Sequence, residues 1–160
     1  YCMTGWRVGY AAGPTNVINA MNKVQSQNVS STASISMAAS VEALNGDQSF
    51  ITSHNKSFLR RRDLVVKHLN ETPGISCRVP EGAFYVFASC KGVLGKKTES
   101  GKIIESDGDF MDYLLEEVGV AGVQGSAFGL DGFFRISYAT SDSILEDACQ
   151  RIKLACSKLS

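Results

Sequence analysis

The sequence predicts an α/β fold, and three observations support this. Short runs of branched and aromatic residues alternate with longer segments whose apolar residues recur at helical spacing. The 160 residues are 44% hydrophobic and 20% charged with a net charge of zero, as in an ordinary globular domain. No apolar run approaches the roughly 20 residues of a membrane span, and no segment reads as a signal peptide. The even charge balance gives no indication of a nucleic-acid or anionic-membrane partner.

The first part of the chain predicts one strand and two helices. Residues 6–13 are apolar without polar alternation, as in a strand covered on both faces, although such a strand needs partners that this chain does not obviously contain. Pro14 suits the first turn of a helix. Helical spacing then predicts helices over residues 15–27 and 35–44, the second closed by Gly46.

A long helix and a pair of strands follow. Residues 48–70 form a long helical pattern, which the Thr-Pro-Gly sequence at 72–74 ends because proline cannot continue the hydrogen bonding. Residues 77–79 and 83–88 predict two strands around a Pro-Glu-Gly turn. Residues 91–108 are polar and rich in Gly and Lys, which predicts a mobile surface loop.

The last third predicts two helices and two further strands. Residues 110–118 predict a short helix, capped from the side of Asp107 and Asp109 and ended by Gly119. Strands are predicted over 120–123 and 133–139, separated by a Gly-rich segment. A final helix carries one apolar stripe with acidic residues near its start and lysines near its end. The stripe consists of Leu145, Ala148, Ile152, Ala155 and Leu159.

Cysteine and histidine usage indicates no metal site. The five cysteines (Cys2, Cys77, Cys90, Cys149 and Cys156) are widely spaced and form no CxxC pair, and the two histidines stand at no ligand spacing from them. Reduced thiols in a cytoplasmic protein are the expected state. A nucleophilic cysteine with a histidine base remains an alternative that no motif supports. The three arginines at 60–62 are interpreted as a solvated helix face rather than a phosphate patch.

Two arginines stand inside predicted strands, where an unpaired guanidinium is costly. Arg7 lies in GWRVGY and Arg135 in FFRISYA. Strand alternation puts Arg135 on one face with Phe133 and Ser137. Each arginine either reaches water or an ion-pair partner, or forms part of a site for a carboxylate or phosphate.

Four motifs, taken together and in order, resemble a known family. MTGWRVGYAAGP, PEGAFYVF, GSAFG and FFRISYATSDSILEDACQRI resemble the C-terminal part of fold-type I pyridoxal-phosphate aminotransferases, most closely the class I aspartate aminotransferase family. The resemblance covers essentially the whole chain. It implies that residues 1–30 are the C-terminal end of the cofactor-binding large domain, 31–70 connecting helices, and 71–160 a small α/β domain.

The resemblance also implies site residues. Arg7 matches the arginine that binds the phosphate of the cofactor, pyridoxal 5'-phosphate, and Arg135 matches the arginine that pairs with the substrate α-carboxylate. Tyr85, with the phenylalanine before it, matches a structural residue of the small domain, and Gln124 stands where the family usually has proline. The family's Schiff-base lysine lies eight residues before the position of Arg7, which falls upstream of Tyr1. No catalytic residue is therefore expected within these residues.

The activity that the resemblance implies is transfer of an amino group from an amino acid, aspartate or glutamate, to a 2-oxo acid. The intact enzyme is expected to be a cytoplasmic homodimer, and the 160-residue chain alone is expected to be inactive. Two alternatives stay open. The chain could be a non-catalytic remnant or an anion-binding or interaction module, or it could belong to a related transaminase specific for alanine, aromatic substrates or prephenate.

Overall fold

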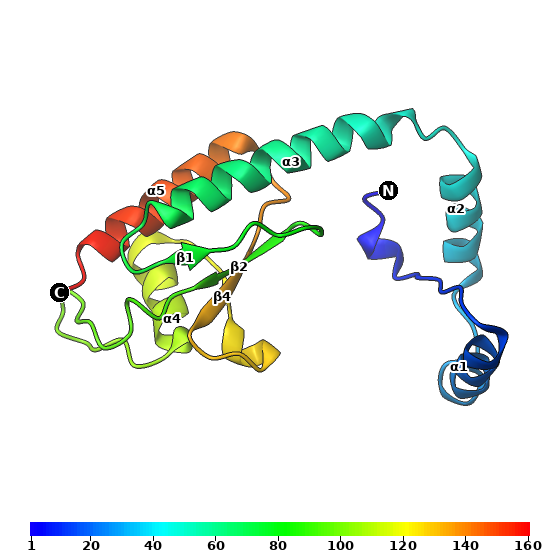
Figure 1. The fold of residues 1–160 in the computed structure, drawn as a ribbon, viewed down its shortest axis with the longest axis horizontal. Helices are drawn as coiled ribbons and strands as arrows, with labels where there is room; N and C mark the ends of the chain where they lie inside the picture. Colours follow the sequence, from blue (N-terminus) through cyan, green and yellow to red (C-terminus); the bar gives the residue numbers. More distant parts are fainter. The chain divides into compact units, whose positions relative to one another are not determined.

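The computed structural model describes residues 1–160, which divide into two compact units, Tyr1–Ser53 and His54–Ser160. The first unit contains the 3-10 helix η1 (Thr4–Trp6) and the helices α1 (Thr15–Asn28) and α2 (Ser34–Asn45). Helix α3 (Ser49–Asn70) begins in the first unit and continues into the second (Figure 1). None of the helices combines the length and the apolar character that crossing a membrane would require.

The helices of the first unit confirm the sequence prediction to within one residue at each end. The carbonyl of Pro14 accepts the amides of Val17 and Ile18 at 3.0 and 3.1 Å, so α1 begins directly after the proline. Helix α2 ends at Gly46, whose amide donates to the Glu42 carbonyl. Local sequence therefore accounts for both helices.

The predicted strand over residues 6–13 is wrong. Thr4–Trp6 form a 3-10 turn, Arg7 follows in the left-handed region at φ 51°, and no strand pairs with the segment after it. A strand needs a neighbour to accept and donate its backbone hydrogen bonds. This unit supplies none, and the segment is largely exposed.

The second unit contains a four-stranded antiparallel sheet in the order β1-β2-β4-β3. Its strands are β1 (Ser76–Cys77), β2 (Tyr85–Ser89), β3 (Val123–Gln124) and β4 (Phe133–Ser137). The central pair β2–β4 confirms the predicted strands at these positions. The prediction over 120–123 overlaps β3 only at Val123, because Gly119 and Val120 instead complete the end of the preceding helix by donating to the carbonyls of Leu115 and Leu114.

Three helices cover one face of this sheet. Helices α3, α4 (Asp107–Val118) and α5 (Asp142–Ser157) pack there, and Figure 1 shows α3 and α5 running side by side. The core includes the sheet residues Val86, Ala88 and Phe134, all 0% exposed. From the helices it includes Val65, Leu69, Phe110, Leu114, Leu145, Ile152 and Ala155. The predicted apolar stripe of α5 is thus confirmed, with Ala148 partly buried at its edge.

The segment 91–108, predicted as a mobile surface loop, is instead tied into the core. Val93 and Ile104 are 0% and 1% exposed. The amide of Gly95 donates to the carbonyl of Ile104, and Lys97 exchanges backbone hydrogen bonds with Ser160 at 2.8 and 3.1 Å. Val93 and Ile104, with the partly buried Leu94, pack this segment against the core, although the surrounding composition is polar.

Helix α4 begins three residues earlier than predicted, and its cap uses Asp109, as predicted, but not Asp107. Ser106 is the N-cap, and its hydroxyl accepts the Asp109 amide at 3.1 Å while the Asp109 carboxylate accepts the Ser106 amide at 3.0 Å. The helix therefore begins at Asp107. This leaves the carboxylate of Asp107 available for contacts outside the helix.

Candidate functional site

Arg135 lies on β4, on the sheet face that the helices leave uncovered. Phe134 beside it is 0% exposed and points into the core, whereas Arg135 is half-buried on the opposite side, as alternation predicts. Its guanidinium carbon lies 4.4 Å from the centre of the Tyr85 ring and 4.5 Å from that of the Phe128 ring. Such contacts fix the plane of a guanidinium while its N–H edge stays available.

No acidic side chain pairs with Arg135 in this chain. Its contacts are the two rings, without an ion pair or hydrogen bond to another residue. The sequence left open whether Arg135 reaches water, pairs with an acidic residue of the chain or binds an anion. The structure shows no ion pair within the chain. A half-buried guanidinium without a carboxylate neighbour is the donor arrangement that suits a carboxylate ligand.

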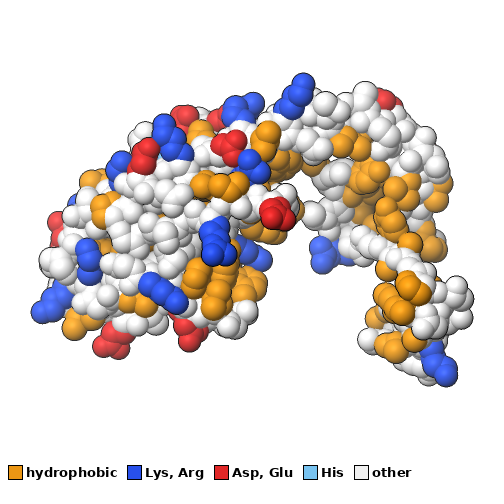
Figure 2. All heavy atoms as spheres, in the orientation of Figure 1, with side chains coloured by type: hydrophobic (Ala, Val, Ile, Leu, Met, Phe, Trp, Pro, Cys, Tyr) orange, Lys and Arg blue, Asp and Glu red, His pale blue; other side chains and the backbone are white.

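The same face carries a row of further aromatic rings. Phe87, the register partner of Arg135, stacks on Phe133 with ring centres 5.4 Å apart and meets Phe128 edge-on at 6.1 Å. The ammonium of Lys91 lies 5.2 Å from the Phe133 ring centre. Figure 2 shows hydrophobic side chains bordered by Lys and Arg side chains in this part of the unit. The open face thus combines apolar surface with positive charge.

Phe128 reaches this face from the Gly-rich segment between β3 and β4. The 3-10 helix η2 (Gly125–Phe128) ends at Gly129, which is left-handed at φ 77°. A Cβ at Gly125 would meet the backbone oxygen of Leu130, so only glycine fits there. The amide of Leu130 closes the turn on the Gly125 carbonyl at 3.1 Å. These bonds make the segment a defined turn, although Gln124 stands where the resemblance implied a proline.

Sequence reasoning missed two features of this site. Tyr85, for which the resemblance implied a structural role, lies directly against the Arg135 guanidinium. Asp107, interpreted only as a helix cap, is 3% exposed and accepts the amides of Ser126 and Gly132. A carboxylate that reaches across to a distant turn leaves no local sequence signal.

Arg7 lies in the first unit, at the end of η1. Its side-chain Nη1 donates to the Thr4 carbonyl at 2.9 Å, and its amide donates to the same oxygen at 3.3 Å. The hydroxyl of Ser36 in α2, the one buried residue of this unit, donates to the Trp6 carbonyl at 2.8 Å. The turn that carries Arg7 is therefore anchored, while the rest of its guanidinium is exposed and makes no ion pair.

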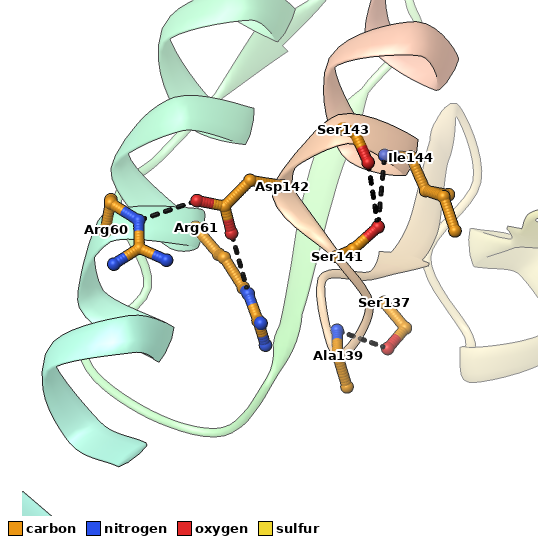
Figure 3. Close-up of polar contacts among 8 residues, drawn as sticks. All are labelled: Arg60, Arg61, Ser137, Ala139, Ser141, Asp142, Ser143 and Ile144. Atoms are coloured by element: carbon orange, nitrogen blue, oxygen red, sulfur yellow. Dashed lines mark hydrogen bonds and ion pairs between the residues drawn. The ribbon is translucent and has the colours of Figure 1, made fainter. Parts of the chain in front are cut away.

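The arginine run 60–62 lies at the surface of α3, where Arg60 is solvated as expected with 59% of its side chain exposed, but all three arginines also form ion pairs. Arg60 and Arg61 donate through Nε to opposite oxygens of Asp142 at 2.7 and 3.0 Å (Figure 3). Arg62 pairs with Asp63 at 2.7 Å. The hydrogen bonds from Arg60 and Arg61 lower the pKa of the Asp142 carboxyl to about 2. These arginines link α3 to the start of α5.

The cysteines of the second unit are not suited to nucleophilic chemistry. Burial raises the pKa of the Cys77, Cys90 and Cys149 thiols to about 11 and that of Cys156 to about 12. None of the five cysteines forms a disulfide, and Cys2 is exposed. The buried thiols therefore pack as small apolar groups.

The fold of this chain matches part of the structures of a known class of transferases, the aminotransferases. The sequence pattern of the family "Aminotransferase class I and II" matches residues 1–152, and the chain belongs to this family. This confirms the predicted family and the predicted α/β fold.

The similar proteins are aspartate aminotransferases and their relatives. The crystal structure of the aspartate aminotransferase from Rhizobium meliloti superposes with a TM-score of 0.87 at 61% identity, over 100% of this chain and 40% of that one. The aspartate/prephenate aminotransferase of Cereibacter sphaeroides is 53% identical over 160 residues, which cover 100% of this chain and 40% of the relative. An alanine aminotransferase from Pyrococcus furiosus superposes at 0.76 with 29% identity, over 94% and 38% of the two chains. The chain spans about 39% of the length of the curated Rhizobium meliloti relative.

Proposed function

We propose that this chain is the carboxylate- and phosphate-binding part of an aminotransferase that moves an amino group from aspartate or glutamate to a 2-oxo acid. Family membership supports the reaction type. Aspartate is named in the relatives at 61% and 53% identity. The observation that carries the proposal is the geometry of Arg135.

In this proposal Arg135 binds the α-carboxylate of the substrate. Two charge-assisted N–H···O bonds from one guanidinium edge fix both the position and the plane of a carboxylate. Tyr85 and Phe128 restrain the guanidinium plane at 4.4 and 4.5 Å, so little side-chain freedom is lost when the ligand binds. The substrate Cα–H bond is thereby oriented for proton removal.

Arg7 is proposed to hold the phosphate of pyridoxal 5'-phosphate. Its exposed guanidinium uses one donor on its own turn, and the remaining donors suit an anion. When bound, the cofactor supplies the electron sink that amino-group transfer requires. Arg7 contributes charge and hydrogen bonds to its phosphate. No motif places any lysine of these 160 residues at a cofactor, so we propose that the chain alone is inactive.

A related substrate range is a second candidate. A relative at 53% identity and another at 60% are named aspartate/prephenate aminotransferases. The rings of Phe87, Phe128 and Phe133 beside Arg135 offer apolar surface to a substrate larger than aspartate. Assays of the intact protein with glutamate as the amino donor and either oxaloacetate or prephenate as the 2-oxo-acid acceptor decide between the two.

We also propose a cellular location and an oligomeric state for the intact enzyme. The absence of disulfides among the five cysteines supports a reducing, cytoplasmic location. The intact enzyme is proposed to be a homodimer, as the family resemblance implies. Sedimentation of the intact protein tests the oligomeric state directly.

The test of the proposed function is replacement of Arg135 in the intact protein. Arg135→Lys keeps the charge but loses the planar fork, and Arg135→Ala loses both. We expect KM for the amino acid to rise about a hundredfold in Arg135→Ala, the effect of losing charge-assisted hydrogen bonds, and by less in Arg135→Lys. Arg78→Ala, an exposed arginine of the same unit, is the control. Unchanged KM in Arg135→Ala would reject the role of Arg135.

A further inference from the structure

Asp107 is a buried carboxylate without a cationic partner. It is 3% exposed and belongs to no ion pair. Isolated burial of a carboxylate is costly unless hydrogen bonds replace its hydration. Here one oxygen accepts the Ser126 amide at 2.8 Å and the other accepts the Gly132 amide at 3.4 Å. Although burial opposes ionisation, these hydrogen bonds hold the pKa of the Asp107 carboxyl below its ordinary value.

The two amides stand near the two ends of the turn that carries Phe128. We call residues 125–132 the arginine-facing turn. Its first half is closed by hydrogen bonds from Gly129 to Ser126 and from Leu130 to Gly125. Its far end is held from the other side, because the amide of Cys90 donates to the Gly132 carbonyl at 2.9 Å. Asp107 therefore holds both ends of the turn from one buried point.

Phe128 is the residue through which this turn meets the site. Its side chain is half-exposed, and its position depends on the turn rather than on burial in the core. The ring centre lies 4.5 Å from the Arg135 guanidinium carbon and 6.1 Å from the Phe87 ring centre. A turn that opened would withdraw one of the two rings that hold the guanidinium.

We propose that Asp107 is a positioning residue for Arg135: it anchors the arginine-facing turn at Ser126 and Gly132 and so holds Phe128 against the guanidinium. The kinetic consequence of this proposal rests on the function proposed for Arg135, whereas its structural consequence does not. The start of α4 does not require Asp107 for capping, since Ser106 and Asp109 already form the capping box. The carboxylate of Asp107 is directed to the turn instead.

Asp109 provides a matched control. Both residues are aspartates in the first turn of α4, but the Asp109 carboxylate accepts hydrogen bonds from Ser106 and Glu105 next to the helix and pairs with Lys102 at 3.9 Å, away from the turn. Asp109→Asn removes the same charge and weakens the helix start without touching the turn. Asp107→Asn keeps one acceptor oxygen and loses the other, and Asp107→Ala loses both.

The structural experiment uses the 160-residue chain and measures the Arg135 side chain by NMR. The Nε–Hε resonance of Arg135 reports the shielding by the two rings. We expect it to move toward its unshielded position most in Asp107→Ala, less in Asp107→Asn and not in Asp109→Asn. The amides of Ser126 and Gly132 should exchange at least about tenfold faster in Asp107→Ala, as their local protection is lost.

Phe128→Leu keeps the inference testable if Asp107→Ala does not fold. This variant removes the ring while leaving the Asp107 hydrogen bonds, so it should reproduce the Arg135 shift without faster exchange at Ser126. Two results would overturn the proposal. One is an unmoved Arg135 resonance in Asp107→Asn and Phe128→Leu, and the other is an equal displacement in Asp109→Asn.

The kinetic experiment uses the intact enzyme. Asp107→Asn should raise KM for the amino acid about two- to tenfold while leaving kcat less affected, the size of a coupling between residues that share a network of contacts. In an Arg135→Ala background the same substitution should add nothing to KM. If Arg135→Ala alone leaves KM unchanged, the proposed function fails while the NMR result stands. If Asp107→Asn raises KM equally in both backgrounds, the positioning role fails.

Discussion

The two units of this chain differ in how much of their structure they stabilise themselves. All buried hydrophobic residues lie in His54–Ser160, whereas the only buried residue of Tyr1–Ser53 is Ser36. The first unit instead exposes large apolar side chains along its helices, which Figure 2 shows over α1 and α2. These include Val17, Met21, Val24, Ile35, Met37 and Val41. Local sequence can specify helices without a core, but it cannot stabilise a strand.

The apolar surface of the first unit includes a concave region. A cavity of about 350 Å³ is lined by side chains from the N-terminal segment and from α2. Its lining includes Tyr1, Met3, Val8, Tyr10, Met37 and Leu44. Tyr1 also meets Phe50 edge-on, with ring centres 6.3 Å apart. These contacts are few beside the continuous core of the second unit, so the first unit should open more easily.

Thiol reactivity gives the largest expected contrast between the units. Cys2 is exposed, while burial raises the pKa of the other four thiols to about 11 or 12. With a chromogenic disulfide reagent at pH 8, one thiol should react rapidly and four at least about a thousandfold more slowly, because they require unfolding. Cys2→Ser should abolish the rapid phase. A second rapid thiol would show that the core of the second unit is open.

Truncation of a core side chain should distinguish the two units almost as clearly as thiol reactivity does. Phe134 is fully buried and meets Phe110 edge-on with ring centres 5.5 Å apart. Phe134→Ala should lower the free energy of unfolding by about 3–5 kcal/mol, through lost burial and the cavity left behind. Val24→Ala on α1 removes a side chain that is 68% exposed and should change it by less than about 0.5 kcal/mol. Urea denaturation measures both, and a large loss in Val24→Ala would mean that α1 is packed in solution.

The same contrast explains which predictions from sequence succeeded. The helices over 15–27 and 35–44 were predicted correctly because spacing and the adjacent Pro14 and Gly46 are local signals. The strand over 6–13 was wrong because its apolar composition could not reveal whether a neighbouring strand exists. The prediction for 91–108 was wrong for the opposite reason, since a few buried apolar side chains and backbone hydrogen bonds hold this polar segment against the core.

The site was predictable only in part. Arg135 stood out because a charge inside an apolar strand is costly, and its face followed from alternation. Its contact with Tyr85 depends on the β2–β4 register, and that with Phe128 depends on the turn. The two hydrogen bonds that Asp107 accepts come from residues 19 and 25 positions away. Such tertiary pairings have no periodic signal in one sequence.

Glycine substitutions should give a smaller contrast between the units. A Cβ at Gly92 would lie 2.7 Å from the Cα and 2.8 Å from the carbonyl oxygen of Gly74, where two backbone segments cross. Gly92→Ala should therefore cost about 1–3 kcal/mol of unfolding free energy through overpacking. A methyl group added at Gly9 in the first unit would meet no atom within 4 Å, so Gly9→Ala should be neutral or stabilise by up to about 1 kcal/mol. Thermal or urea unfolding of the two variants tests the difference, and equal costs would contradict it.

The smallest expected effect is that of acidic pH on the stability of the two units. Asp142 joins Arg60 and Arg61 of α3 to the start of α5 (Figure 3), whereas in the first unit the Asp47 carboxylate accepts only the nearby Ser49 amide and hydroxyl. The hydrogen bonds from the two arginines lower the pKa of Asp142 from 3.8 to about 2. A carboxyl whose pKa is lower in the folded state stabilises above its unfolded pKa and loses this contribution as pH falls through its folded pKa.

The pH dependence of an Asp142 variant therefore has a defined sign. Asp142→Asn should lower the urea midpoint modestly at pH 7, and the difference from wild type should shrink as pH falls below 3.8 and disappear only below about pH 2. Asp147→Asn is the matched control, because it removes a single exposed pair with Arg151 within α5. Its midpoint should stay close to that of wild type at every pH. A difference between Asp142→Asn and wild type that persists unchanged at pH 2 would mean that Asp142 acts through packing and not through its charge, so the link between α3 and α5 would not be electrostatic.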